Sequence, residues 1–314
     1  MTFELRLVVI ALATYFVAGL LVTPLVPWLW RRTASARDDM RATRLYRLRM
    51  LPSVFAFGAM TTASISFYIF EQRQWLESYG VAPKVIALGA ALLGIVSIGR
   101  AASMWLKTWQ LRRLWMTGAQ PIDIPGVDIP AYRVETAFPI VAVVGARRPA
   151  LVIARPVLDA CSAEELAAIL AHEQGHIARR DNLRRALISA APDVLSWLPI
   201  ARRFQQDWHD ATEEAADDAA GQLGATGRVA LAQALVRVAR IAHAAPALPP
   251  LPASALYRGE NIEGRVRRLL ADPVVATTLP PFVWRAGAAL TIAVCLLTLQ
   301  AVHTLVEAVV QFLP

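Results

Sequence analysis

The chain has 314 residues, of which 56% are hydrophobic and 18% are charged, with a formal net charge of +8. We find no nucleic-acid-binding module, so direct binding of nucleic acid is not expected, and the positive charge is assigned to membrane topology and anionic lipid surfaces. A structural disulfide is not expected either, because the two cysteines, Cys161 and Cys295, lie in a soluble segment and in an apolar run.

Four apolar stretches approach the roughly 20 residues that an α-helix needs to cross a bilayer. They cover residues 7–30, 51–70, 85–106 and 286–305. The first is too long for a cleavable signal peptide, and no small-residue cleavage site follows it. The third contains Arg100, close enough to its end for the guanidinium to reach the interface. The sequence therefore predicts about four transmembrane helices.

Charges in the loops orient these helices. The loop at 31–50 carries seven arginines against two aspartates. Because cytoplasmic loops carry an excess of Lys and Arg, we expect this loop and the segment 107–285 in the cytoplasm, with both termini outside. The predicted regions are three transmembrane helices with a basic loop in residues 1–106, a cytoplasmic domain in 107–280, and a fourth transmembrane helix with a short tail in 281–314.

The first part of the soluble segment contains strand signals. Residues 131–137, 140–144 and 150–154 predict three short strands, the last two joined by a turn-forming connection at 145–149. One of these strands should form an exposed sheet edge. Such an edge can bind an extended peptide as an additional strand. A strand pair that only covers a helical core is equally compatible with the sequence.

A helix with two histidines one turn apart follows the strands. Ser162 and Glu165 form a capping box, with Ser at the N-cap and Glu at N3, so a helix is expected to start there. His172, Glu173 and His176 then read H-E-x-x-H. Residues i and i+4 share a helical face, so both imidazoles can bind one zinc ion while the glutamate takes a proton from the metal-bound water. This pattern is typical of a zinc peptidase, with Glu173 as the catalytic base.

The motif is not of the extended type with a third histidine. That type needs Gly at 179 and His at 182, where this chain has Arg179 and Asn182. Gly175, inside the motif, costs the helix about 1 kcal/mol relative to Ala, a penalty that close backbone approach explains better than packing. The third ligand is therefore expected to be a glutamate on a later helix.

A carboxylate-rich helix downstream offers that ligand. Glu213 and Asp217 are spaced i,i+4, as are Glu214 and Asp218, so spacing alone leaves two registers. We choose Glu213 as the ligand and Asp217 as the carboxylate that fixes the ring of a ligating histidine. His209, one turn before Glu213, could stabilise an oxyanion, although a solvated helix histidine is the more common role.

The remaining soluble segments are interpreted as helical. One or two helices are expected through 181–197, broken by Pro192, and the stretch 186–200 is apolar enough to lie against the bilayer. Asp193 is expected to be a helix cap rather than a buried charge. The run 265–270 predicts a short basic helix near the membrane surface, with a structural role.

Two runs of the chain resemble the motifs of a known family. Residues 170–182, LAHEQGHIARRDN, and residues 213–219, EEAADDA, are similar to those of the BlaR/MecR-type membrane metallopeptidases. The second matches that family's E-x-A-x-D helix, which settles the register on Glu213. The family's topology also matches: three spans, a cytoplasmic peptidase domain and a fourth span. In antibiotic-sensing members a penicillin-binding domain follows the last span. No S-x-x-K or K-T-G signature follows it here, so direct β-lactam sensing is not expected.

We therefore predict a mostly α membrane protein, with about four transmembrane helices and an inserted α+β zincin-like (gluzincin) peptidase domain. The predicted cofactor is Zn²⁺, held by His172, His176 and Glu213. The resemblance implies a multi-pass protein of the bacterial cytoplasmic (inner) membrane, with its peptidase domain facing the cytoplasm. Its substrate would be a cytoplasmic or membrane-associated protein cleaved in signal transduction, with a DNA-binding transcriptional repressor as the candidate. A sensor protein or a second copy of the chain is the candidate regulatory partner.

Two other functions stay open. The chain could be a quality-control or processing peptidase similar to HtpX or the CAAX prenyl proteases, which share H-E-x-x-H and a glutamate ligand. It could also be a membrane scaffold that keeps a metal-binding fold without turnover. Metal content and cleavage of casein distinguish the scaffold from the enzymes, and trapped substrates distinguish the two kinds of enzyme.

Overall fold

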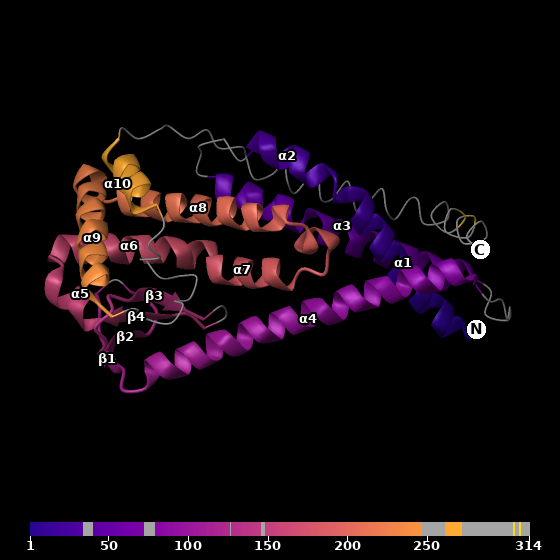
Figure 1. Ribbon diagram of the computed structural model, residues 1–314, viewed down its shortest axis with the longest axis horizontal. Helices are drawn as coiled ribbons and strands as arrows, with labels where there is room; N and C mark the ends of the chain where they lie inside the picture. Colours follow the sequence, from indigo (N-terminus) through magenta and orange to yellow (C-terminus); the bar gives the residue numbers. More distant parts are fainter. Residues whose placement is uncertain are drawn as a thin grey trace. The chain divides into compact units, whose positions relative to one another are not determined.

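The computed structural model describes residues 1–33, 40–71, 79–125, 127–145, 148–246 and 261–271, and residues 304 and 308 (Figure 1). The helices are α1 (Phe3–Val22), α2 (Leu25–Thr33), α3 (Arg41–Phe70), α4 (Val81–Met116), α5 (Arg155–Ala160), α6 (Ala163–Arg179), α7 (Asp181–Ala190), α8 (Ile200–Gly221), α9 (Gly224–Ala244) and α10 (Ile262–Leu270). The strands are β1 (Gln120–Ile122), β2 (Ala131–Val134), β3 (Val141–Val144) and β4 (Ala150–Ala154). The fourth transmembrane helix predicted at 286–305 lies, except for residue 304, outside the described residues.

Backbone contacts divide the described residues into two compact units. The span unit contains Met1–Arg100 and Ala190–Gln205. The sheet unit contains the described residues of Ala101–Ser189 and Gln206–Val275. A segment from the middle of the predicted soluble domain thus packs in the span unit. The domain boundaries given above, at 106/107 and 280/281, remain predictions.

Among the residues that the structure describes, three helical stretches are long and apolar enough to cross a membrane, judged by length and composition: Phe3–Arg32, Arg41–Phe70 and Val81–Met116. They correspond to the first three predicted spans. The first stretch combines α1 and α2, which are separated at Thr23 and Pro24. Proline supplies no backbone N–H, so the helical hydrogen bonding is interrupted there.

Helix α3 begins at Arg41, so the predicted connection at residues 31–50 is helical from Arg41 onward. Ala42, Leu45 and Arg49 recur at helical spacing and are all buried on one face of this helix. Because Arg49 is charged, it does not count as an apolar residue, and the helical spacing of this buried face was not recognised in the sequence. The helical part of the predicted loop continues directly into the second span.

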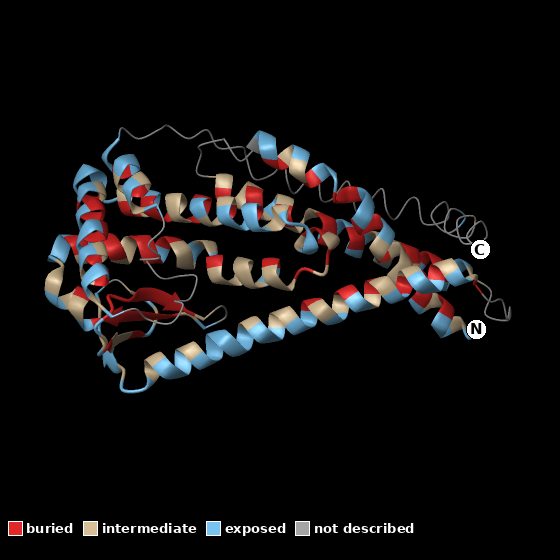
Figure 2. Ribbon diagram, viewed as in Figure 1, coloured by how far each residue is buried: buried red, intermediate tan, exposed pale blue. Residues whose placement is uncertain are grey.

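Large apolar side chains are exposed along α4. Leu88, Leu92, Ile95 and Ile98 are each between 57% and 70% exposed, and Figure 2 shows pale blue and tan over most of this helix. Exposed apolar surface of this extent is uncommon on a water-soluble monomer, and it is the surface that a helix presents to lipid. The pattern supports a membrane protein.

A polar cluster centred on Asp193 lies inside the span unit. Oδ1 of Asp193 accepts from the N–H of Ser196 at 3.0 Å and thereby caps the 3-10 helix Val194–Trp197. Its Oδ2 accepts from the Ser53 hydroxyl at 2.6 Å and pairs with Nη1 of Arg49 at 2.9 Å. Because Asp193 is 4% exposed, it is a helix cap and a buried charge at once. The expected helix cap is confirmed, whereas the expectation that this charge is not buried is wrong.

Backbone carbonyls next to Asp193 bind the other two long helices of the span unit. The hydroxyl of Tyr15 on α1 donates to the carbonyl of Pro192 at 2.7 Å. Ser97 and Arg100 on α4 donate to the carbonyl of Ala191 at 3.3 and 2.9 Å. The guanidinium of Arg100 is therefore bonded within the unit. This short segment is held by α1, α3 and α4 together.

The sheet unit contains a four-stranded sheet in the order β1-β2-β4-β3. The outer strands run antiparallel to their neighbours, whereas β2 and β4 are parallel. The three predicted strands are present, although β2 ends at Val134 rather than at residue 137. β1 was not predicted because Pro121 at its centre argues against a strand, but proline is tolerated on an edge strand. All residues of β3 and β4 are buried, and α6 packs against β3.

Candidate metal centre

Two helices bring three metal-binding side chains together. His172 and His176 lie on α6 and Glu213 on α8, and one ligand atom of each falls within 4.8 Å of the others. The Nε2 atoms of the two histidines are 3.2 Å apart. Glu213 places Oε2 3.6 Å from Nε2 of His172 and Oε1 3.5 Å from Nε2 of His176. Ligand atoms about 2.1 Å from a tetrahedral zinc ion lie about 3.4 Å from one another, so this spacing fits such an ion.

A carboxylate lies behind each histidine ring. Nδ1 of His172 is 3.0 Å from Oδ1 of Asp217, and Nδ1 of His176 is 2.9 Å from Oδ2 of Asp181. An N–H at Nδ1 that faces a carboxylate leaves the lone pair of Nε2 for a metal. The structure thus places Asp217 where the sequence analysis put it. Asp181 was missed, and its one sequence signal is its position five residues after His176.

Local sequence signals determine where α6 begins and ends. The predicted capping box is confirmed: the Ser162 hydroxyl accepts from the N–H of Glu165, whose carboxylate accepts from the N–H of Ser162 at 2.8 Å. At the other end, Arg180 adopts the left-handed conformation, with φ 54°. This residue turns the chain, so that Asp181 starts α7 beside the metal centre.

Gly175 allows α6 and α8 to approach closely. A Cβ atom at this position would lie 2.9 Å from Cβ of Ala219 and 3.3 Å from Cα of Ala216, both on α8. A side chain would therefore push the two helices apart and lengthen the distances between the ligand atoms. The close backbone approach predicted for this glycine is confirmed.

Glu173 is a buried carboxylate beside the metal-binding side chains. It is 1% exposed, and its oxygens have no well-formed hydrogen bond among the described residues, although the backbone N–H of Val143 is close enough to lower its pKa. Burial raises the pKa of Glu173 to about 8, although positive charge on His176 opposes the shift. A divalent cation bound by the neighbouring histidines would favour the ionised carboxylate, which is the form that a general base needs.

Arg265 enters the centre from α10. Its Nη1 is 3.1 Å from Oε2 of Glu213, its Nη2 is 2.6 Å from Oδ1 of Asp217, and its Nε donates to Oδ2 of Asp217 at 3.0 Å. Burial alone would raise the pKa of Glu213, but the charges of His176 and Arg265 lower it to about 2. Burial also opposes the shift at Asp217, whose pKa is lowered by Arg265 and His172. Both carboxylates are therefore ionised at neutral pH.

Only a structural role was predicted for the run 265–270, and the contact of Arg265 with the centre was not predicted. Arg265 is 9% exposed, whereas the neighbouring Arg267 and Arg268 are exposed. The signal that could have separated them is position, because Arg265 lies four residues before the buried Leu269, on the same face of α10.

Residues 133–269 match the family described as BlaR1 peptidase M56. The match confirms the resemblance found in the two motifs, and it spans every metal-centre residue named above. With the three apolar helices, it indicates a membrane metallopeptidase. The chain has no significant match among curated proteins.

His209 of the M56 segment lies beside Glu213 rather than in solvent. Its Nδ1 is 3.8 Å from Oε1 of Glu213 and 3.5 Å from Nη2 of Arg185. The side chain is 13% exposed, so the expectation of a solvated helix histidine is wrong. A role in stabilising an oxyanion stays a prediction.

The edge strand β3 is bonded to α7, the helix that follows the H-E-x-x-H helix α6. The side-chain amide of Asn182 on α7 donates to the carbonyls of Val143 and Gly145 at 2.8 and 3.3 Å. Asn182 directly follows Asp181, which contacts His176. One edge of the described sheet therefore lies beside the metal centre.

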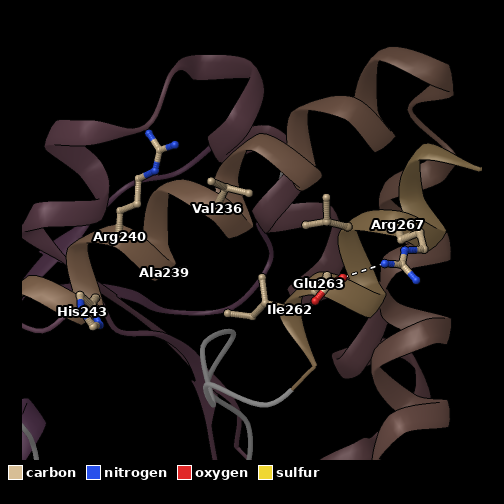
Figure 3. Close-up of a pocket in the computed structure, with 8 residues that line it drawn as sticks. Val236, Ala239, Arg240, His243, Ile262, Glu263 and Arg267 are labelled. Atoms are coloured by element: carbon tan, nitrogen blue, oxygen red, sulfur yellow. Dashed lines mark hydrogen bonds and ion pairs between the residues drawn. The ribbon is translucent and has the colours of Figure 1, made fainter.

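A groove between α9 and α10 of the M56 segment is distinct from this centre (Figure 3). Its volume is about 710 Å³, and it is lined by Val236, Ala239, Arg240, His243, Ile262, Glu263, Val266 and Arg267. Arg267 and Glu263 form an ion pair of 2.7 Å at its rim. None of the lining residues belongs to the His172, His176 and Glu213 cluster, so we assign the chemistry to the cluster and not to the groove.

Proposed function

We propose that the protein is an integral-membrane zinc endopeptidase. The observation that carries this proposal is that the Nε2 atoms of His172 and His176 lie 3.2 Å apart and that each is within 3.6 Å of one of the two carboxylate oxygens of Glu213. Zinc favours a set of two histidines and one glutamate with a fourth position open for water. Calcium and magnesium take six or more ligands, mostly oxygen, and fit this set poorly.

The residues of the centre have separate tasks in this proposal. A bound zinc ion would supply Lewis acidity and lower the pKa of the attacking water to about 7. Glu173 would take a proton from the attacking water onto a carboxylate oxygen while the water oxygen bonds to the carbonyl carbon, and would donate that proton to the amide nitrogen as the C–N bond breaks. Asp217 and Asp181 keep the histidine rings in one orientation.

We further propose that β3 binds the substrate as an added strand. β3 is an edge of the described sheet and is tied by Asn182 to the helix beside the centre. An extended peptide that pairs with an edge strand is held in one register, which can present one amide bond to the metal. Because Asn182 already donates to the carbonyls of Val143 and Gly145, the added strand would use the remaining edge groups of β3.

The cellular role in this proposal is proteolytic signalling at the bacterial cytoplasmic membrane. The arginine excess in residues 31–50 supports a cytoplasmic peptidase, the family match supports a peptidase, and the motif resemblance suggests a regulatory protein such as a DNA-binding repressor as the substrate. A Glu173→Gln protein used as a substrate trap separates this role from its rival. Capture of one DNA-binding protein supports signalling, whereas capture of many damaged membrane proteins supports quality control.

The zinc proposal is tested with the full chain in detergent or lipid nanodiscs. We expect one zinc ion per chain by elemental analysis, and cleavage of casein or of the chain itself. Glu173→Gln should retain the metal while cleavage falls by roughly 10²–10⁴-fold, because the base is lost. Undiminished cleavage would remove Glu173 from the mechanism. Folded wild-type protein that binds no zinc would refute the metal site.

A further inference from the structure

Arg179, the last residue of α6, joins the helices of the metal centre. Its Nη1 donates to the carbonyl of Ala215 at 3.0 Å, and its Nη2 donates to the carbonyl of Thr212 at 3.2 Å. Nη2 also donates to Oδ2 of Asp181 at 3.1 Å. The side chain is 19% exposed. One guanidinium therefore holds two backbone carbonyls of α8 and the first residue of α7.

Each of these partners is next to a group that would touch the metal or orient a ligand. The two carbonyls on α8 belong to residues on either side of Glu213 in the sequence. Oδ2 of Asp181, which accepts from Arg179, is also the atom 2.9 Å from Nδ1 of His176. Arg179 thus connects the backbone that carries one ligand with the carboxylate that orients another.

We propose that Arg179 is a positioning residue that sets the affinity for zinc by fixing the two-histidine helix against the glutamate helix. This inference rests on the proposed zinc centre, and Arg179 itself does not touch the reacting atoms. Coordination distances tolerate changes of only about 0.2 Å, so a small slide of α8 along α6 would take Glu213 out of range. Hydrogen bonds to the backbone of α8 resist such a slide directly.

Arginine is suited to this contact and lysine is not. The guanidinium offers planar donors that reach several acceptors at once, whereas the lysine ammonium is a single nitrogen on a flexible stem. The guanidinium lies beside Gly175, because a Cβ atom there would be 3.4 Å from Nη1 of Arg179, and it would be closer still to Ala219 and Ala216 of α8. The missing side chain and the guanidinium therefore serve the same contact between α6 and α8.

Arg237 on α9 provides a matched control at the opposite end of α6. Its Nε and Nη2 both donate to Oε1 of Glu165 at 3.1 Å. Glu165 is 2% exposed, so this pair also fastens α6 to another helix through a buried group. Because Glu165 lies in the first turn of α6, loss of the pair should weaken packing without moving a metal ligand.

The test compares the full-length wild type with Arg179→Lys and Arg237→Lys. Zinc affinity is measured by competition with a chromophoric chelator, ligand geometry by the visible spectrum of the cobalt(II) form, and packing by thermal unfolding. For Arg179→Lys we expect zinc affinity to fall by about 10–100-fold, as for other residues that orient metal ligands, with an altered cobalt spectrum. For Arg237→Lys we expect zinc affinity within about two-fold of the wild type, whatever its unfolding temperature.

Several results would overturn the role of Arg179. Equal zinc affinity in Arg179→Lys and wild type would refute it while leaving the zinc centre intact. An equal loss of affinity in Arg237→Lys would also refute it, because general loosening would then explain both variants. A wild type that binds no zinc would overturn the centre and this role together. If Arg179→Lys shows no cooperative unfolding, Arg179→Gln takes its place with the same outcomes.

Discussion

The polar cluster around Asp193 and the metal centre are both built from buried charges, but they differ in how far those charges are satisfied. Oδ1 of Asp193 is bonded by Ser196, and Oδ2 by Ser53 and Arg49. Glu173 is 1% exposed against 4% for Asp193, yet in the described part of the chain its oxygens have no well-formed hydrogen bond and only a weak contact with the backbone N–H of Val143. A satisfied buried carboxylate stabilises a structure, whereas an unsatisfied one costs free energy and indicates a group that reacts.

Asp193→Ala should produce the largest loss of stability. It would leave the guanidinium of Arg49 buried without its partner, so we expect the free energy of unfolding to fall by about 3–5 kcal/mol. Thr61→Ala, an exposed position on α3, is the control and should change it by less than about 0.5 kcal/mol. Thermal and denaturant unfolding in detergent measure both. An Asp193→Ala protein as stable as the control would show that the cluster does not hold the span unit together.

Asp217→Asn should weaken zinc binding by about 10–100-fold, since the ring of His172 would lose its charged partner. The neighbouring Asp218→Asn is a matched control, because Asp218 is 52% exposed and pairs with Arg268 away from the ligands. Equilibrium chelator competition gives both affinities. Equal losses in the two variants would mean that the acidic helix acts through its total charge and not through a specific contact of Asp217 with His172.

Glu173→Gln should change stability in the opposite direction from Asp193→Ala. In the metal-free protein the pKa of Glu173 is raised from 4.5 to about 8, so the folded state takes up a proton that the unfolded state does not hold. This group's contribution to stability therefore falls as the pH rises from about 4.5 through about 8. An amide needs no proton, and at pH 7 we expect the variant to be more stable by about 1–3 kcal/mol. Unfolding curves of the chelated protein between pH 5 and 8 measure this difference, and a destabilised variant would show that the carboxylate has a partner.

Arg267→Ala should have the smallest effect of the series. Arg267 and Glu263 pair at 2.7 Å but are 79% and 85% exposed, and exposed pairs of this kind contribute about 0–1 kcal/mol. We expect neither zinc affinity nor the unfolding temperature to change measurably. A loss of zinc in this variant would show that the whole basic face of α10, and not Arg265 alone, supports the centre.

The ligand helix could be predicted from the sequence because its signals are local. The capping box at Ser162 and the one-turn spacing of His172 and His176 depend only on helical geometry. The spacing of Glu213 and Asp217 is of the same kind, although it left two registers that the motif resemblance decided. Gly175 correctly indicated close helix packing, because a glycine inside a helix lowers its stability and therefore requires a structural reason.

The other residues of the centre depend on tertiary contacts that spacing does not encode. Arg265 arrives from a helix 48 residues after Asp217, and its neighbours are arginines of the same helix with exposed side chains. Arg49 and Asp193 pair across 144 residues. Charged residues are mostly solvent-exposed, so from the sequence each of these residues is expected on the surface unless a buried partner is known. The sequence alone therefore could not show which arginines and aspartates are buried.

Residues 190–205 lie within the stretch that matches the M56 family, yet they pack in the span unit. Leu195 and Phe204 are almost completely buried there, and the ring of Phe204 stacks on Trp30 with centroids 4.2 Å apart. A water-soluble fragment cut at the ends of the family match would leave these apolar groups uncovered and prone to aggregate. Recombinant production of the catalytic segment therefore has to retain the N-terminal helices that cover it.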